Sequence, residues 1–264
     1  MSSHNEQNEI VFSSDVEEVL NSVSSYREQI PFPHVLIDDL FEPQLLLDVI
    51  SEIPTPFNSD DLFNLDVSYL QEKKFAFRNV QEFGPKTQAL IYSLTTKPFL
   101  DLLSKLTGIP ALIPDPYFLG AGFHQILRGG KLAIHADFNV HPDLSLYRRV
   151  NLLLYINKDW SQDWGGDLEL WDESMESCVK KVAPHFNRMV IFTTSENSFH
   201  GHPDSLNCPP DRIRLSLALY YYTALPPGEA QKPHVTVWKD RPIDDGTVSR
   251  SMAAFLKTIP TSDP

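Results

Sequence analysis

The stretch YRRVNLLLYINKDWSQDWGGDLELWD, residues 147–172, contains two short strand-like runs, the first largely apolar and the second alternating, on either side of a Gly-Gly pair. The first run covers residues 150–156 and the second covers residues 167–170. Short apolar runs bounded by turn residues are typical of β-strands, and glycines provide the backbone freedom that tight turns need. This stretch therefore predicts a strand, a turn and a second strand.

Similar runs occur on both sides of this stretch, at residues 118–127, 132–135, 189–193 and 215–223. No segment with a helical period separates them, so the alternation of strand and helix that builds a parallel sheet is missing. Many short strands separated by Gly, Pro and Asp turns favour a sandwich, a barrel or a jelly roll.

The chain before residue 110 has a different pattern. Apolar residues recur at helical spacing near residues 16–23, 45–50, 85–94 and 97–106, and Ser14 and Glu17 have the spacing of a capping box. A short strand is predicted at residues 35–37, whereas residues 56–78 give no clear pattern. The predicted organisation is an N-terminal helical or mixed segment over 1–110, a β core over 111–225 and a Pro-rich extension over 226–264.

Charge and composition narrow the class of partner. Lys plus Arg number 22 and Asp plus Glu number 35, which gives a net charge of −13. An acidic surface repels phosphate backbones and anionic lipids, so neither a nucleic acid nor a membrane is expected as a partner. Cys178 and Cys208 are too few for a disulfide framework. No signal peptide and no run of ~18 apolar residues is visible, and the expected location is the cytoplasm.

His135 and Asp137 are the first candidates for chemistry. Residues i and i+2 of a strand point to the same face, so the imidazole and the carboxylate can converge on one point. His200 and His202 lie about sixty residues downstream, and one of them could supply a third ligand. Two histidines and one carboxylate form the facial triad of non-haem Fe(II) oxygenases.

Arg212, Arg214 and Ser216 alternate at the start of the last apolar run. A guanidinium that points inward from a buried strand must meet an anion, because an unpaired buried charge is costly. Its planar fork matches a carboxylate, which would be either an internal Asp or Glu or the carboxylate of a bound ligand.

The chain has a His-x-Asp motif, then a long β segment, then a histidine, and finally Arg-x-Ser on the last strand. With its motifs in this order, it resembles the Fe(II)- and 2-oxoglutarate-dependent dioxygenases, specifically the prolyl 4-hydroxylase-like group. The resemblance covers residues 115–223 and includes NRMVIFTTSENSFHGHPDSL at 187–206 and RLSLALYYYT at 214–223. PFPHVLIDDLFEP at 31–43 also resembles the N-terminal part of such enzymes. The resemblance implies a double-stranded β-helix core, of the jelly-roll or cupin-like kind, with an N-terminal helical elaboration.

The resemblance also implies which residues bind iron and 2-oxoglutarate. Fe(II) would be held by His135, Asp137 and His200, with His200 preferred over His202 because SFHGHP matches the family pattern best when its first histidine is the ligand. Arg214 is the expected partner of the distal carboxylate of 2-oxoglutarate. O₂ and a small-molecule or peptidyl substrate complete the reaction, with ascorbate as a candidate reductant.

Further residues are predicted to contact the cosubstrate. Ser216 and Tyr155 are the expected helpers of Arg214, and Asn151 lies on the same strand face as Tyr155. Gln125 stands where several relatives carry a tyrosine that contacts 2-oxoglutarate, and it could donate a hydrogen bond instead. Arg148 and Arg149 could select a carboxylate of the substrate, but a solvated pair in the ion network of an acidic protein is the favoured interpretation.

The predicted function is hydroxylation of an unactivated C–H bond in a proline, an amino-acid-like compound or a small metabolite, with release of succinate and CO₂. A metal-binding sensor or scaffold without catalysis is the alternative. This alternative is disfavoured because the three expected metal ligands occur together with Arg214 and Ser216, the residues expected to bind 2-oxoglutarate. A zinc hydrolase would need a general base beside the metal, and the sequence offers none with motif support.

Overall fold

The computed structural model describes residues 16–22, 25–58, 62–67, 69–224 and 232–257. Its strands are β1 (His34–Asp38), β2 (Phe63–Asn64), β3 (Gln71–Phe77), β4 (Ile113–Pro114), β5 (Gly122–Ala136), β6 (Tyr147–Tyr155), β7 (Leu168–Trp171), β8 (Cys178–Val182), β9 (Arg188–Thr193), β10 (His200–His202), β11 (Arg214–Thr223) and β12 (Val237–Trp238). Its helices are α1 (Val16–Ser22), α2 (Pro43–Glu52), α3 (Pro85–Thr95), α4 (Lys97–Thr107) and α5 (Thr247–Leu256), with 3₁₀ turns at Tyr26–Glu28, Val80–Glu82 and Gln162–Trp164.

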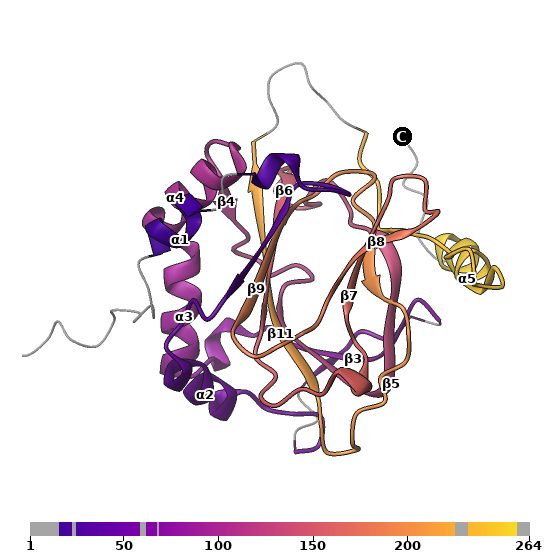
Figure 1. Cartoon of the computed structure of the whole chain (residues 1–264), viewed down its shortest axis with the longest axis horizontal. Coiled ribbons are helices and arrows are strands. Elements are labelled where there is room, and N and C mark those ends of the chain that lie inside the picture. Colours follow the sequence, from indigo (N-terminus) through magenta and orange to yellow (C-terminus); the bar gives the residue numbers. More distant parts are fainter. Residues whose placement is uncertain (1–15, 23–24, 59–61, 68, 225–231, 258–264) are drawn as a thin grey trace, which may run out of the picture.

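The described strands form one curled antiparallel sheet. Hydrogen-bonded neighbours follow the order β1-β9-β6-β11-β5-β10-β7-β8, and β3 also pairs with β5. Helices α1 to α4 lie together on one side of this sheet, and α5 lies on the other (Figure 1). The predicted fold class, a mainly β jelly roll with an N-terminal helical elaboration, is confirmed.

The predicted strands are present with shifted ends. The runs at 150–156, 167–170, 189–193 and 215–223 correspond to β6, β7, β9 and β11. The runs at 118–127 and 132–135 join into one long strand, β5. Strands β2 and β3 lie in the stretch 56–78, where no clear pattern is predicted, and β12 and α5 lie in the C-terminal extension.

Helices α2, α3 and α4 match their predicted segments, and the helix predicted near 16–23 is described as α1. The predicted capping residue Ser14 lies outside the described residues. Strands β1 and β3, which belong to the predicted N-terminal segment, pair with β9 and β5 of the core. The N-terminal part therefore extends the central sheet as well as covering it.

Side chains of β6 alternate between two environments, and this alternation places the site. Leu152 and Leu154 pack into the large core cluster that also contains buried leucines of α2, α3 and α4. Asn151, Leu153 and Tyr155 point the other way and line a cavity inside the curl of the sheet. The helices thus cover the outer face, and polar and apolar side chains of the inner face line the cavity.

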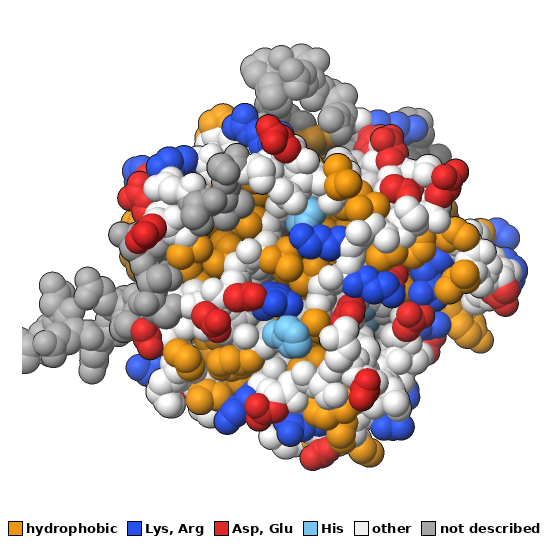
Figure 2. Space-filling view, in the orientation of Figure 1, with side chains coloured by type: hydrophobic (Ala, Val, Ile, Leu, Met, Phe, Trp, Pro, Cys, Tyr) orange, Lys and Arg blue, Asp and Glu red, His pale blue; other side chains and the backbone are white. Residues whose placement is uncertain are grey.

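The surface carries charged side chains of both signs. On the face shown in Figure 2, acidic and basic side chains are interspersed. Among the described helices, none is both long and apolar enough to cross a bilayer.

Asn187 connects three strand ends at the beginning of β9. Its side chain accepts a hydrogen bond from Phe41 N at 3.2 Å and donates one to Phe41 O at 2.7 Å, while its backbone N donates to Tyr155 O at 2.9 Å. Its φ angle is 59°, a left-handed conformation that asparagine adopts more readily than most residues. Asn187 therefore fixes the end of β6 that carries Tyr155.

Replacement of this residue tests how much it stabilises the sheet. Asn187→Ala should lower the free energy of unfolding by about 2–4 kcal/mol, because it removes two buried hydrogen bonds and places alanine at a positive φ. Asn187→Gly should cost less, since glycine adopts this φ without strain. Denaturant titration measures both values. Equal losses for the two variants would show that the backbone conformation contributes nothing.

Candidate active site

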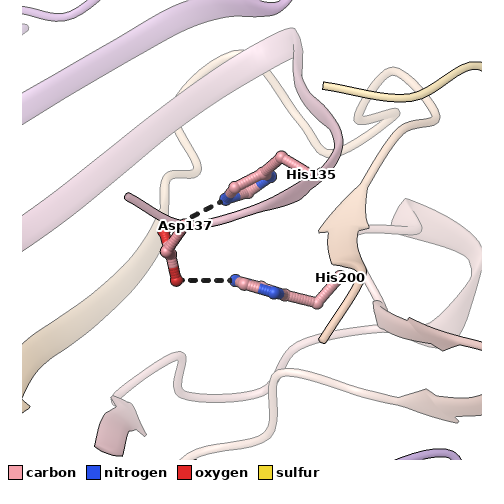
Figure 3. A group of neighbouring side chains, drawn as sticks. All are labelled: His135, Asp137 and His200. Carbon is pink, nitrogen blue, oxygen red and sulfur yellow. Dashed lines mark ion pairs between the residues drawn. The ribbon is translucent and has the colours of Figure 1, made fainter. Parts of the chain in front are cut away.

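Three side chains from two neighbouring strands converge inside the curl of the sheet. His135 of β5 and His200 of β10 are direct partners in the antiparallel ladder, and Asp137 follows β5 by one residue. The Nε2 atom of His135 lies 3.7 Å from Asp137 Oδ1, and that of His200 lies 3.6 Å from Asp137 Oδ2. Figure 3 shows both rings directed at the carboxylate.

Each imidazole is held in one orientation by a hydrogen bond to the backbone carbonyl two residues before it. The Nδ1 atom of His135 donates to Ala133 O at 2.9 Å, and that of His200 donates to Ser198 O at 2.8 Å. A hydrogen bond from Nδ1 fixes the tautomer, so that the lone pair is on Nε2 and faces Asp137. Trp238 and Phe192 pack against the His135 and His200 rings at centroid distances of 4.8 and 4.7 Å.

Gly201 explains how β10 comes so close to β5. A Cβ atom at this position would lie 2.7 Å from Ala133 O and 2.8 Å from Leu132 O, too close for any side chain. The sequence His-Gly-His therefore places a glycine where two backbones approach each other. The two histidines on either side then point into the cavity, where both contribute to the wall.

The charge state of the cluster suits a metal ligand set. Burial lowers the pKa of His135 to about 3 and also lowers the pKa of His200, so both rings are neutral at neutral pH. Burial acts to raise the pKa of Asp137, but the combined effect of its neighbours, with the charge of Arg148 the largest, outweighs it, and the pKa lies well below its usual value. Neutral imidazole and ionised carboxylate are the forms that bind metals.

The cluster fits Fe(II) by its donor set. One ligand atom from each of His135, Asp137 and His200 lies within 4.8 Å of the others. Two imidazoles and one carboxylate on one side leave the opposite side open for other ligands, which is the arrangement of the non-haem Fe(II) oxygenases. His202 is not part of this group, so the structure brings together the predicted set with His200 as its distal histidine.

The open side of the triad faces a cavity of about 830 Å³. Ligand pockets commonly have this size. Its wall includes the predicted cosubstrate residues Arg214, Ser216, Tyr155 and Asn151, but not Gln125. Side chains of the C-terminal extension, including Trp238 and Phe255, complete the wall.

Arg214, Tyr155 and Ser216 form a polar group at one part of this wall. Arg214 is buried, donates from Nε to Gly166 O at 2.7 Å and donates from a terminal nitrogen to Tyr155 Oη at 3.3 Å. Ser216 is the ladder partner of Tyr155 on the neighbouring strand. Arg214 forms no ion pair with any carboxylate of the described residues, so the internal Asp or Glu partner that the sequence left open is not found there.

Gln125 lies on the other face of β5, and its predicted contact with the cosubstrate is not supported by this position. Its side chain donates to Pro54 O at 2.8 Å, whereas His124 and Ile126 line the cavity. The physical reason is an irregularity in pairing: Glu72 of β3 opposes Lys131, but Lys74 opposes Ile126. The additional β5 residues between these pairs reverse which residues of the strand face the cavity. In a regular strand, Gln125 would share a face with His135, because their positions differ by an even number; here it points away from the cavity.

Asn151 and Arg148 both contact the carboxylate of Asp137. Asn151 donates to Asp137 Oδ2 at 2.7 Å and accepts from Arg148 Nε at 2.9 Å. A terminal nitrogen of Arg148 lies 3.1 Å from the same carboxylate oxygen. The prediction of a solvated Arg148 is wrong, because this side chain is 3% exposed and pairs with Asp137. Arg149, its neighbour, contacts Thr223 instead.

Two further cavity residues were not found from the sequence. Lys74 of β3 is buried and lines the cavity, and His124 does the same from β5. Lys74 lies in the stretch without a predicted pattern, and His124 has no motif around it. The run QEKKFAF around Lys74 begins with four polar residues and does not alternate, so it gives no signal that Lys74 points inward. Arg212, which the sequence placed on the face of Arg214, is exposed, with its guanidinium 5.6 Å from the Trp164 ring centroid.

Substitution of the two histidines of β10 separates a ligand from a cavity residue. His200→Ala should weaken the binding of Co(II) or Zn(II) by at least about 100-fold, because it removes one of three protein ligands. His202→Ala should retain stoichiometric binding. Competition with a chromophoric chelator measures both affinities, and the reverse ranking would overturn the assignment of His200.

Asn151→Ala tests the orientation of Asp137. It should lower metal affinity by about 10- to 100-fold, the usual effect of removing a partner that orients a ligand. Asn157→Ala is the matched control, since Asn157 is a buried asparagine at the end of β6 that bonds only to backbone, at Pro184 O and Leu215 N. If both variants bind metal equally well, Asn151 does not position the carboxylate.

Comparison with known proteins agrees with this geometry. Residues 121–222 match the model of the 2OG-Fe(II) oxygenase superfamily. Prolyl 3-hydroxylase OGFOD1 of Mus musculus is 23% identical over 217 residues, which cover 78% of this chain and 37% of the relative. The Xenopus laevis protein of the same name is 24% identical over 203 residues, covering 74% of this chain and 36% of the relative. The chain thus spans little more than a third of these relatives.

Solved structures show the same fold. A prolyl-4-hydroxylase of Pseudomonas putida superposes with a TM-score of 0.53 at 16% identity, covering 78% of this chain and 98% of that one. A prolyl hydroxylase of Trichoplax adhaerens, in complex with a peptide fragment of the oxygen degradation domain of hypoxia inducible factor, gives 0.55 at 17% identity, with coverage of 78% and 90%.

The match to the oxygenase model agrees with the family resemblance that the sequence motifs predicted, and the donor set of the triad fits Fe(II). The buried triad and the arginine of the closing strand both lie within the matched residues. Residues 121–222 of this chain are therefore similar to the 2OG-Fe(II) oxygenase superfamily, and the fold is similar to that of the prolyl-4-hydroxylase.

Proposed function

We propose that this protein is a hydroxylase that oxidises an unactivated C–H bond of a prolyl residue in a peptide or protein. The observation that carries the proposal is the presence, in one cavity, of a His-Asp-His triad and of a buried arginine without a counter-ion among the described residues. An unpaired buried guanidinium is costly, so Arg214 favours an anionic ligand close to the metal ligands.

Arg214 would bind the distal carboxylate of 2-oxoglutarate. Its Nε and one terminal N–H are used by Gly166 O and Tyr155 Oη, which hold the guanidinium plane in place and leave its other N–H groups for the ligand. Tyr155 Oη can donate its own hydrogen to the same carboxylate, and the Ser216 hydroxyl lies on the neighbouring strand beside it. These groups set the distance from the metal at which the cosubstrate is held.

His135, Asp137 and His200 would hold Fe(II). When bound, Fe(II) and 2-oxoglutarate supply the activation of O₂, with one oxygen atom going to the substrate C–H bond and the other to succinate as CO₂ is released. The chain orients the ligands through Ala133 O, Ser198 O and Asn151. The packing of Trp238 on His135 keeps water away from that side of the triad.

The apolar part of the cavity supports an uncharged substrate group. Besides its polar residues, the wall contains apolar side chains from four separate parts of the chain: Leu65, Val67, Phe138, Val140, Trp238 and Phe255. Such a wall fits a pyrrolidine ring by the burial of apolar surface. The names of the curated relatives and the peptide complex of a structural neighbour support a prolyl residue over a free metabolite.

Anaerobic titration tests the metal and cosubstrate. Addition of Fe(II) and then 2-oxoglutarate to the protein should produce a visible charge-transfer band, since both bind in one cavity. Asp137→Ala should show no band, and Arg214→Ala should need about 10- to 100-fold more 2-oxoglutarate, because it removes a charge-assisted hydrogen bond.

Proline-containing peptides test the substrate. Mass spectrometry should find one added oxygen atom on a prolyl residue, only when Fe(II), 2-oxoglutarate and O₂ are all present. A band without any oxygenated peptide would restrict the proposal to the cosubstrate and leave the prolyl assignment wrong. No band in the wild-type protein would favour the metal-binding sensor or scaffold. A cytoplasmic location and the use of ascorbate stay predictions from the sequence.

A further inference from the structure

Lys74 is a buried lysine that has no role in the site described above. It lies on β3 with 8% of its surface exposed and lines the same cavity as the metal triad and Arg214. Among the described residues, no carboxylate lies within ion-pair distance of its ammonium; the one acidic residue of the cavity wall, Asp137, is already paired with Arg148. Burial of an unpaired ammonium is costly, so this position needs an explanation.

The strand register places Lys74 close to Arg214. Ile126 of β5 is the ladder partner of Lys74 on one side and of Arg214 on the other. The three residues therefore form a row across neighbouring strands, with the Cα atoms of Lys74 and Arg214 about 10 Å apart. All three line the cavity, and the two long side chains can meet above Ile126.

His202 adds a third polar group to the wall of the same cavity. It is 3% exposed, lines the cavity, and neither of its ring nitrogens has a hydrogen-bond partner among the described residues. Arg214 and Lys74 line the same cavity as this ring. A buried imidazole with two unused nitrogens is rare in a native protein and indicates a ligand that supplies the partner.

Lys74 remains a cation at neutral pH. Burial lowers its pKa to about 8, the charge of Asp137 acts in the opposite direction, and the repulsion by Arg214 and Arg148 adds to the effect of burial. The cavity thus presents two cations without counter-ions in one row, Arg214 and Lys74, and an unpartnered imidazole in the same cavity wall. A carboxylate has about four lone-pair directions, more than Arg214 alone can satisfy here.

We propose that Lys74 and His202 bind the distal carboxylate of 2-oxoglutarate together with Arg214, so that the anion is held from β3, β10 and β11. This inference rests on the proposed function, because it concerns the cosubstrate of that reaction. The receptor formed by three strands selects a dicarboxylic 2-oxoacid over a monocarboxylic one. It also gives β3, a strand outside the family match, a part in cosubstrate binding.

Calorimetric titration of the Zn(II)-loaded protein tests this selection. The two ligands are 2-oxoglutarate and 2-oxobutyrate, which share the 1-carboxylate and keto group but differ in the distal carboxylate. Lys74→Met should weaken 2-oxoglutarate binding by about 10- to 100-fold and leave 2-oxobutyrate unchanged, because only the former loses a charge-assisted hydrogen bond. His202→Phe keeps a ring of similar shape and should weaken 2-oxoglutarate by a smaller factor.

Lys73→Met is the matched control. Lys73 is the adjacent lysine of β3, is exposed and donates to Arg128 O, so its loss changes the charge of the strand but not the cavity. It should bind both oxoacids as the wild type does. Thermal melting without ligand adds a second readout: Lys74→Met should melt at or above the wild-type temperature, because an unpaired buried ammonium is removed.

The outcomes separate this inference from the function on which it rests. If the wild-type protein fails to bind 2-oxoglutarate, the proposed function itself fails. If the wild type binds but Lys74→Met binds equally well, or loses both oxoacids to the same extent, the role of Lys74 is overturned. If Lys74→Met melts well below the wild type, Lys74 is structural, and Lys74→Gln provides the binding measurement in a variant of nearly the same length.

Discussion

The carboxylate of Asp137 is the constraint on which the arrangement of this site depends. It is nearly buried inside the curl of the sheet, and a buried charge needs partners. Arg148 and Asn151 supply them from β6, at 3.1 and 2.7 Å. Because these partners keep the carboxylate ionised and fixed, the two neutral imidazoles can face it, and a divalent cation gains three preoriented ligands.

Two irregularities in strand pairing decide which residues reach this carboxylate. In β6, Tyr221 opposes Val150 but Tyr222 opposes Arg148, so an additional residue stands in the ladder. Such a bulge shifts the alternation, and Arg148 turns inward while Arg149 does not. In β5, a similar irregularity opposite β3 turns His124 and Ile126 toward the cavity in place of Gln125. The rule that every second residue of a strand points to the same face therefore fails at both places.

The sequence therefore predicted the parts of the site that local patterns determine. His135, Asp137 and His200 lie in short motifs, and Arg214 begins an apolar run whose alternation is regular up to Tyr221. It could not predict Lys74, whose inward direction depends on pairing between strands that are about fifty residues apart. It also could not show that Trp238, from a stretch without a pattern, packs on His135. Bulges and long-range pairing are properties of the folded sheet.

The protein is acidic overall, but one of its cavities contains unpaired cations. This distribution of charge favours the binding of an anion in that cavity. The net charge is −13, yet Arg214 and Lys74 have no carboxylate beside them among the described residues, and the one carboxylate in the cavity wall is already paired with Arg148. These buried cations lower the stability of the ligand-free protein. A dianionic ligand relieves that cost, so its binding energy also stabilises the folded sheet. The cavity is thus preorganised for the anion rather than for its own packing.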